Sequence, residues 1–271
     1  MISHFLTVLI IVFAGFAAYN GYKLVRYYLD LRANEQAAAL AADVFNKATE
    51  PPAMPTPTAT PTPTTGATET PVPATEAPVV QVVQPGILAL REEFKNDDIV
   101  GYLSIEGTNI QQVVVQTIDN DFYLRRGIDK QSNQAGTIFM DSSNNPAMTD
   151  YNTVLYGHNM RNGSMFHELR YYTSKAFFED HSIIVYQSLY EETRWEVFAF
   201  YPTETEFNYI NTVFSTPEKF TDFLAEIRLK SVVASDITVT ADDAILTLST
   251  CTSNGDGRRY ALHARLIETE E

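Results

Sequence analysis

The chain has 271 residues, of which 45% are hydrophobic and 12% aromatic, and its formal net charge at pH 7 is −15. This length and composition suffice for one or two domains with a packed core. The acidic balance excludes nucleic acid as a partner, because phosphate binding depends on clustered Lys and Arg. The single cysteine, Cys251, excludes an intrachain disulfide, so it is either a small buried apolar residue or a reactive thiol.

The N-terminus carries an uncharged apolar stretch, FLTVLIIVFAGFAAY, from Phe5 to Tyr19. Extended to residues 1–22, it reaches the roughly 20 residues that span a bilayer, which predicts a transmembrane anchor. A cleaved signal peptide is the alternative, but no Lys or Arg precedes the stretch and no small-x-small cleavage site follows it. Residues 23–48 are Ala-rich with apolar residues at helical spacing, which predicts a juxtamembrane helix.

A Pro/Thr-rich tract follows at residues 49–84, and from Thr49 to Pro78 it has hardly an apolar side chain that could be buried. Such a tract cannot offset its ordering entropy, so we expect it to be disordered and solvated. We interpret it as a stalk that holds a C-terminal domain away from the membrane, on the outside of the cell. Lys23, Arg26 and Arg32 favour the cytoplasmic side instead, and a linker without a spatial role is the alternative to a stalk.

Residues 85–271 form the predicted folded domain. Short β-branched and aromatic runs bounded by Gly, Asn and Asp predict nine strands in a mainly β, closed or nearly closed sheet. The runs are VGYLSIEG, IQQVVVQ, GTIFMD, NTVLYG, SIIVYQ, RWEVFAFY, DITVT, AILTLSTC and RYALHARLIE. Helices are expected at REEFKNDD, within GSMFHELRYYTSKAFFEDH, and at STPEKFTDFLAEIRLKS.

The last of these helices has the clearest sequence signals. Ser215 to Glu218 fits a capping box, and Pro217 stands near the first helical position. Its expected apolar face consists of Phe220, Phe223, Leu224 and Ile227.

Nucleophilic catalysis by Cys251 requires a proton partner and a positive group near the developing oxyanion. His158 ends a strand in VLYGHN, at a strand-to-loop junction where catalytic groups concentrate, whereas the other four histidines suit structural roles. Arg258 and Arg259 follow the cysteine across TSNGDG, a turn that would place the next strand antiparallel beside it. From spacing alone, a structural cysteine, a surface arginine pair and a plain Gly-His turn remain alternatives.

These residues resemble those of a class B sortase, a surface cysteine transpeptidase of Gram-positive bacteria. TLSTC with an arginine opening the last strand resembles the family's nucleophile motif, and YGHN resembles its histidine motif. The class B features are YGHNMRNGSMFHEL, the helix before the first strand and the capped helix at 215–231. The resemblance runs from about Arg91 to the C-terminus and includes the anchor, whereas the Pro/Thr tract is not a usual element of the family.

The resemblance implies a sortase-type closed barrel of about eight strands, with an N-terminal helix and a long helix in the loop before the cysteine strand. Cys251 would be the nucleophile, His158 the acid/base, and Arg259 rather than Arg258 would hold the substrate and stabilise the oxyanion. The implied substrate-binding residues are Asn120, Leu124, Tyr156, Thr205, Tyr209, Ile210 and Ser249. Thr252 departs from the family, in which the residue after the cysteine is often acidic.

The implied reaction is cleavage of a C-terminal sorting signal after threonine, through a thioester on the cysteine. The protein so released is joined to an amino group of peptidoglycan or its lipid-linked precursor. The partners would be secreted surface proteins bearing the signal, the acceptor amine, and the cell membrane through the N-terminal helix. No metal or organic cofactor is implied. A pilin-polymerising sortase and an inactive surface-binding module on a stalk are the alternatives.

The pairing of cysteine with histidine also predicts a pH profile. The two side chains titrate near 8.5 and about 6.5 in solution, so an uncoupled pair is mostly thiol and neutral imidazole at neutral pH. If only the minor thiolate–imidazolium form reacts, kcat/KM should depend on pH with a bell shape.

Overall fold

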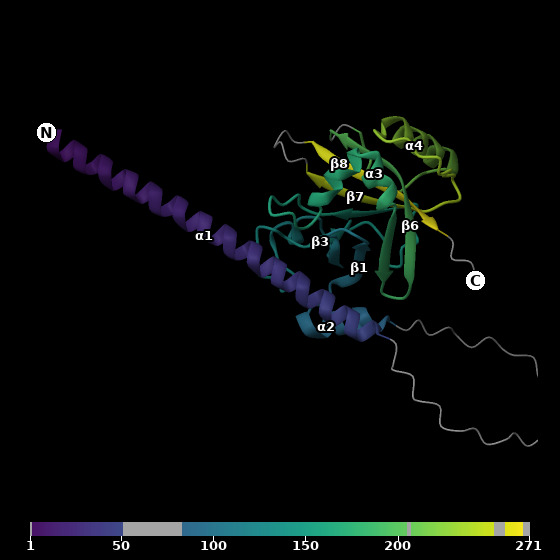
Figure 1. Ribbon diagram of the computed structural model, residues 1–271, viewed down its shortest axis with the longest axis horizontal. Helices are drawn as coiled ribbons and strands as arrows, with labels where there is room; N and C mark the ends of the chain where they lie inside the picture. Colours follow the sequence, from purple (N-terminus) through teal and green to yellow (C-terminus); the bar gives the residue numbers. More distant parts are fainter. Residues whose placement is uncertain (1, 51–82, 205–206, 252–257, 268–271) are drawn as a thin grey trace, which may run out of the picture.

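The computed structural model describes residues 2–50, 83–204, 207–251 and 258–267 (Figure 1). Its centre is a closed β-barrel with the strand order β1-β2-β3-β4-β7-β8-β6-β5. The strands are β1 (Ile99–Ile105), β2 (Gln111–Val115), β3 (Ile138–Met140), β4 (Asn152–Tyr156), β5 (Ile183–Ser188), β6 (Glu192–Thr203), β7 (Ile245–Cys251) and β8 (Arg259–Ile267). This confirms the expected mainly β fold with an eight-stranded closed barrel.

Most strand pairs are antiparallel, but β2–β3 and β4–β7 are parallel. One expected strand is wrong, because residues 236–240 (DITVT) form no ladder. Its alternation instead places Ile237 and Val239 against an apolar cluster outside the barrel. Alternation reports which side chains are buried and does not report whether the backbone has a pairing partner.

The core has three parts, of which the largest fills the barrel. Trp195, Leu103 and Phe200 are fully buried there. A second cluster lies outside β1 and β2, and a third lies outside β6 to β8. Each outer cluster is covered by a helix, so both faces of these strands are apolar, as expected for a sheet buried on two sides.

The remaining helical segments flank the barrel. They are α2 (Pro85–Phe94), η1 (Phe122–Arg125), η2 (His167–Thr173), α3 (Lys175–Asp180) and α4 (Pro217–Lys230), where η marks a 3₁₀ helix. The face of α4 formed by Phe220, Phe223, Leu224 and Ile227 is buried as expected. The expected capping box is one residue off, because Thr216 is the N-cap and accepts from the Lys219 amide. Pro217 fixes the first helical position, so the residue before it becomes the cap.

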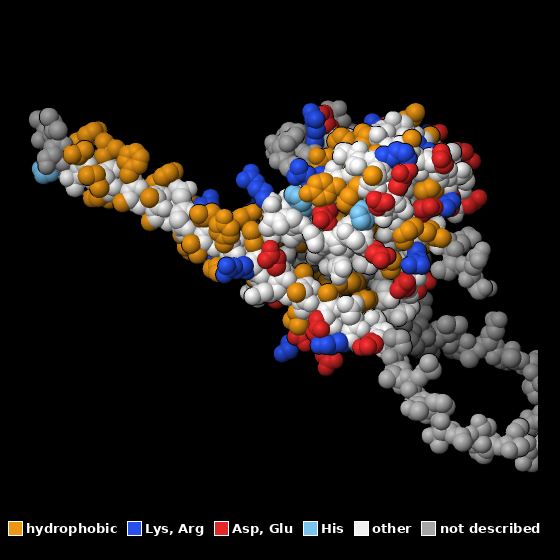
Figure 2. Space-filling model, viewed as in Figure 1, with side chains coloured by type: hydrophobic (Ala, Val, Ile, Leu, Met, Phe, Trp, Pro, Cys, Tyr) orange, Lys and Arg blue, Asp and Glu red, His pale blue; other side chains and the backbone are white. Residues whose placement is uncertain are grey.

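Helix α1 (Ile2–Thr49) is continuous from the N-terminal apolar segment to the barrel (Figure 1). Within the described residues it is the one helix long and apolar enough to span a membrane. Hydrophobic side chains cover its projecting part (Figure 2), among them exposed Phe5, Ile10 and Phe16. This part of the helix has the properties expected of a membrane anchor.

The second half of α1 packs against the barrel and α2. Leu31, Ala41 and Phe45 are buried, and the Phe45 ring stacks on Tyr102 of β1 with centroids 4.2 Å apart. We expected the folded domain to begin at residue 85. The helix expected at residues 23–48 packs against this domain and is part of the same folded unit.

The two ends of the Pro/Thr-rich tract lie side by side. Gly86 at the start of α2 sits so close to α1 that a Cβ there would be 2.6 Å from the Phe45 ring and 3.0 Å from the Thr49 methyl. Residues 51–82 themselves lie outside the described residues. We expected the Pro/Thr-rich tract to act as a stalk between the apolar segment and the barrel. In the structure, the continuous helix α1 spans this distance, so the length of α1 sets the separation.

Candidate active site

Strand register brings the ends of β4, β7 and β8 to one edge of the barrel. Cys251, the last residue of β7, is the backbone partner of Arg259, the first residue of β8. Tyr156, the last residue of β4, is the partner of Ser249 in the parallel pair β4–β7, and the Gly157 amide donates to the Ser249 carbonyl at 3.1 Å. The segment after β4 therefore emerges beside the cysteine and the arginine.

Gly157 allows this segment to pass through a crowded part of the core. A Cβ at this position would lie 2.2 Å from Ile138 Cδ1 and 2.7 Å from the Phe166 ring. The next residue, His158, is half-buried, and its Nε2 atom lies 2.8 Å from the Leu124 carbonyl oxygen. Because a carbonyl oxygen only accepts, Nε2 carries the proton in this contact. The Nδ1 lone pair of the neutral ring is then the one that can take up a proton.

These residues surround a cavity of about 360 Å³. It is bounded by η1, β3 and the segments after β4 and β6, together with the ends of β7 and β8. The lining residues are Asn120, Leu124, Thr137, Phe139, Tyr156, Gly157, His158, Phe207, Asn208, Tyr209, Ile210, Ser249, Thr250 and Arg259. The size and the mixture of aromatic and polar side chains suit a short extended peptide.

A buried carboxylate, Asp141, supports one wall of the cavity. Its Oδ2 atom accepts from the Tyr156 hydroxyl at 2.8 Å and from Asn120 Nδ2 at 3.0 Å. Its Oδ1 atom accepts from the amide and hydroxyl of Ser143. Burial alone would raise the pKa of Asp141, but these hydrogen bonds together lower it below the ordinary value. Burial, reinforced by Asp141, raises the pKa of Tyr156, so the phenol stays protonated and donates.

The segment after β6 closes the opposite wall. The Tyr209 hydroxyl lies 2.8 Å from Ser249 Oγ on β7, and both groups are buried. Asn152 Nδ2 on β4 donates to the Asn211 carbonyl at 2.9 Å, which attaches the same segment to a second strand. Tyr209 is therefore fixed to two barrel strands rather than carried on an unsupported loop.

The two arginines have different surroundings. Arg259 is half-buried and lines the cavity. Arg258 is exposed, and its Nε lies 3.5 Å from a Glu204 carboxylate oxygen that is also exposed. Arg259 is thus the arginine placed for contact with a molecule in the cavity.

Most of the predicted site residues converge on this cavity. His158, Arg259, Asn120, Leu124, Tyr156, Tyr209, Ile210 and Ser249 all line it. The backbone of Cys251 ends the strand at its edge, whereas Thr205 and Thr252 lie outside the described residues. The roles of these residues remain predictions.

Three residues of the site were not predicted from the sequence: Thr137, Phe139 and Asp141. Asp141 is the last residue of the expected strand GTIFMD, and a carboxylate at a strand end was a signal that could have identified it. Thr137 and Phe139 are contributed by a strand that reads as ordinary barrel core, and only the pairing of β3 beside β4 places them at the cavity.

Comparisons with known proteins agree with the geometry. A family model described as the sortase domain matches residues 103–267. Sortase B of Listeria monocytogenes is 41% identical over 174 residues, which cover 64% of this chain and 71% of the relative. Sortase B of Staphylococcus aureus is 39% identical over 156 residues, covering 58% of this chain and 64% of the relative.

Solved structures give the same result. Sortase B from Bacillus anthracis in complex with AAEK1 superimposes with a TM-score of 0.71 at 33% identity, covering 89% of this chain and 100% of that chain. A Staphylococcus aureus sortase B–substrate complex gives a TM-score of 0.66 at 35% identity, covering 70% and 88% of the two chains. The chain belongs to the sortase family of cysteine transpeptidases and is similar to its class B members.

Proposed function

We propose that this chain cleaves a C-terminal sorting signal after threonine and transfers the released protein to a cell-wall amine. The observation that carries the proposal is the cavity at the end of β7, where the register pairs Cys251 with Arg259 and where His158 forms part of the wall. A related sortase B has been solved with a substrate, which supports a peptide as the occupant of this cavity.

The first step forms a thioester. In the reactive form the thiol proton of Cys251 has moved to His158 Nδ1. The Cys251 thiolate attacks the threonine carbonyl carbon, and the resulting oxyanion is stabilised by the permanently charged guanidinium of Arg259. The C–N bond then breaks, and the departing amine takes a proton from His158 Nδ1, because Nε2 is held by the Leu124 carbonyl.

The second step reverses these roles. The acceptor amine attacks the thioester carbonyl, His158 Nδ1 takes up the proton that this amine loses, and the C–S bond breaks to regenerate the thiolate. The proposed acceptor is an amino group of peptidoglycan or its lipid-linked precursor. With α1 as the anchor, the proposed location is the cell membrane with the barrel outside.

Hydroxylamine trapping tests the first step. The full chain in detergent micelles is incubated with hydroxylamine and synthetic sorting-signal pentapeptides, both asparagine-led and leucine- or serine-led. Mass spectrometry should detect a threonine hydroxamate with at least one peptide, together with an acyl-enzyme mass on the wild-type chain. The Cys251→Ala chain should give neither. Equal hydroxamate from both chains, or none with any peptide, would contradict the proposal.

The acceptor requires a second experiment. Replacing hydroxylamine with a peptidoglycan-derived stem peptide should yield a product in which the threonine is amide-linked to that peptide. A product formed only with a lysine-containing pilin peptide would identify a pilin-polymerising enzyme instead.

Membrane orientation is tested in intact cells. In a Cys251→Ala chain, a Thr60→Cys substitution introduces the single thiol. A membrane-impermeant maleimide should label it without lysis if the barrel is outside. Labelling that needs lysis would place the barrel in the cytoplasm.

A further inference from the structure

Helix α1 makes polar contacts with one loop of the barrel in addition to its apolar packing. This loop, residues 133–137, is the last part of the segment that joins η1 to β3. The Asp30 carbonyl accepts from Asn133 Nδ2 at 3.1 Å, and Asp30 Oδ2 accepts from the Gln134 amide at 3.3 Å. One turn further along the helix, Asn34 Nδ2 donates to the Gly136 carbonyl at 3.1 Å. The helix therefore holds the loop at three successive points.

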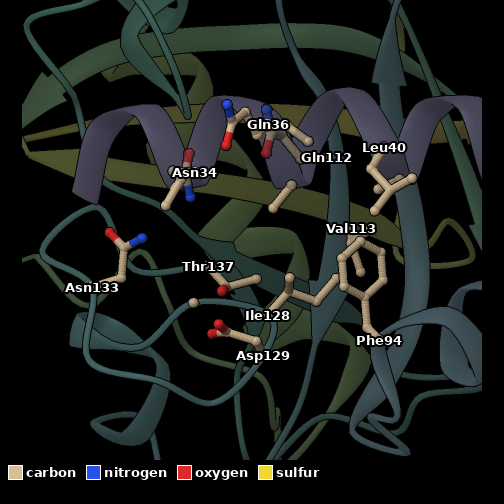
Figure 3. Close-up of a pocket in the computed structure, with 15 residues that line it drawn as sticks. Asn34, Gln36, Leu40, Phe94, Gln112, Val113, Ile128, Asp129, Asn133 and Thr137 are labelled. Atoms are coloured by element: carbon tan, nitrogen blue, oxygen red, sulfur yellow. The ribbon is translucent and has the colours of Figure 1, made fainter. Parts of the chain in front are cut away.

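Figure 3 shows this contact from the side. Asn34 projects from α1 toward the loop that carries Asn133 and Thr137, beside a cavity of about 220 Å³ between the helix and the barrel. Thr137 lines both this cavity and the active-site cavity. Thr137 thus lies between the cavity beside α1 and the active-site cavity.

The loop rests directly on the backbone of η1. Gly136 has φ +62°, and a Cβ there would lie 2.8 Å from the Leu124 carbonyl oxygen and 2.6 Å from the Tyr123 carbonyl oxygen. The Thr137 amide donates to the Tyr123 carbonyl at 3.1 Å. Only glycine can occupy this position without displacing the carbonyl that accepts from His158 Nε2.

We propose that α1 is a positioning element for the proposed acid/base: Asn34 holds the 133–137 loop, the loop fixes the Leu124 carbonyl, and that carbonyl selects the Nε2–H tautomer of His158. The inference rests on the proposed role of His158. Without the carbonyl, the neutral imidazole would populate both tautomers, and in the Nδ1–H form Nδ1, the proposed site of proton transfer, cannot accept a proton. The helix that continues from the membrane segment thereby contributes to catalysis without contacting substrate.

Two variants test this in the full chain in detergent micelles. Asn34→Ala removes the donor to Gly136 while improving helix propensity, so the helix itself should persist. The expected loss of kcat is about two- to tenfold, the equivalent of one hydrogen bond, with KM unchanged. Gly136→Ala pushes against the Leu124 carbonyl directly, and its loss should be larger. The matched control is Gln36→Ala, whose exposed side chain lines the same cavity but, among the described residues, makes no hydrogen bond to the loop, so this variant should behave as wild type.

The decisive readout is the tautomer rather than activity. In chains labelled with ¹⁵N-histidine, the His158 ring signals, assigned with a His158→Gln chain, should show a protonated Nε2 and an unprotonated Nδ1 in wild type. Both Asn34→Ala and Gly136→Ala should shift these signals toward a mixture of tautomers, whereas Gln36→Ala should not.

The outcomes separate this inference from the proposed function. Wild-type ¹⁵N patterns and wild-type kcat in both variants would overturn the positioning role and leave the proposed function intact. So would an equal loss in Gln36→Ala, which would indicate general loosening of α1. If wild type forms no hydroxamate, the proposed function fails, and the tautomer measurement alone decides whether α1 fixes the imidazole.

Discussion

Arg259 and Arg258 show how adjacent identical residues acquire different surroundings from strand register. Arg259 faces the cavity as the first residue of β8, and Arg258 lies outside the strand in solvent. The exposed pair between Arg258 and Glu204 contributes little, because water screens such ion pairs.

We therefore expect the two arginines to respond very differently to substitution. Arg259→Ala should lower kcat by about 10²- to 10³-fold, the usual effect of removing one group that stabilises an oxyanion, and Arg259→Lys should recover only part of it. Hydroxamate kinetics measure the loss. Arg258→Ala is the control and should stay within about threefold of wild type, since Arg258 is exposed and water screens its pair with Glu204. A reversed order would move the oxyanion role to Arg258.

Asp141 combines a structural role with a role in shaping the site. In Asp141→Asn, one oxygen is replaced by an NH₂ group that cannot accept from the Tyr156 hydroxyl or from Asn120. The unpaired buried groups should lower the free energy of unfolding by about 1–3 kcal/mol at pH 7. Because both freed side chains line the cavity, KM for the peptide should rise more than kcat falls.

The stabilisation by Asp141 should also depend on pH. Its folded-state pKa is lowered, so the contribution is complete above the ordinary value near about 4 and is lost as pH falls through the lowered value. Chemical denaturation at pH 7 and pH 3 measures this difference. Asp150→Asn is the control, since among the described residues the hydrogen bonds to its carboxylate come from Asn144 and Asn145, neither of which lines the cavity. A KM increase in both variants would argue against a specific role for Asp141.

At the scale of elements, a buried polar chain ties four adjacent strands together. Thr247 on β7 donates to Asn152 Oδ1 on β4 at 2.7 Å, so its oxygen must accept from His263 Nδ1 on β8. His263 Nε2 then accepts from the Tyr201 hydroxyl on β6 at 2.9 Å. Burial lowers the pKa of His263 to about 3, so the ring stays neutral.

This histidine should make the barrel sensitive to acid. The unfolded chain protonates His263 near pH 6.5 and the folded chain only near pH 3, so stability is complete above about pH 6.5 and falls by about 1.4 kcal/mol per pH unit below it. Denaturant unfolding of wild type and His263→Gln should show a stability gap at pH 7 that shrinks by about 2–3 kcal/mol at pH 4.5. A gap that does not change with pH would mean that His263 has the same pKa in the folded and the unfolded chain.

Local pattern predicted most elements, because alternation and helical spacing depend only on neighbouring residues. It predicted α4 and its buried face, and eight of the nine proposed strands correspond to the barrel. It could not predict that 236–240 has no partner strand, since pairing is decided by residues far along the chain. The Leu124 carbonyl was missed for the same reason. The carbonyl belongs to the backbone, and it meets His158 across 34 positions of sequence.

At the scale of the whole molecule, the Pro/Thr-rich tract leaves the folded unit and returns to it at one place. Its flanking residues Thr49 and Gly86 are in contact distance, so shortening the tract requires no movement of α1 or α2. Changing the length of such a loop also changes its closure entropy only slightly, by about 0.6 kcal/mol for each doubling.

Deleting residues 55–78 from the full chain should therefore leave kcat/KM within about twofold and the melting temperature nearly unchanged. Calorimetry and hydroxamate kinetics in detergent provide the measurement. As a contrast, Gly86→Val places a side chain against the Phe45 ring and should lower the melting temperature and detach α1. Loss of activity on deletion would show that the tract has a role in catalysis.

The continuity of α1 also determines the orientation of the active-site cavity around the helix axis. About eight residues, or little more than two helical turns, separate Tyr22 at the end of the apolar segment from buried Asp30. Inserting one residue there would rotate the barrel by about 100° around the helix axis and raise it by only about 1.5 Å. Inserting seven residues would restore the original orientation of the barrel and raise the barrel by about 10 Å. The number of residues between the apolar segment and the barrel therefore determines how the cavity is oriented relative to the bilayer. The residues that line the cavity do not affect this orientation.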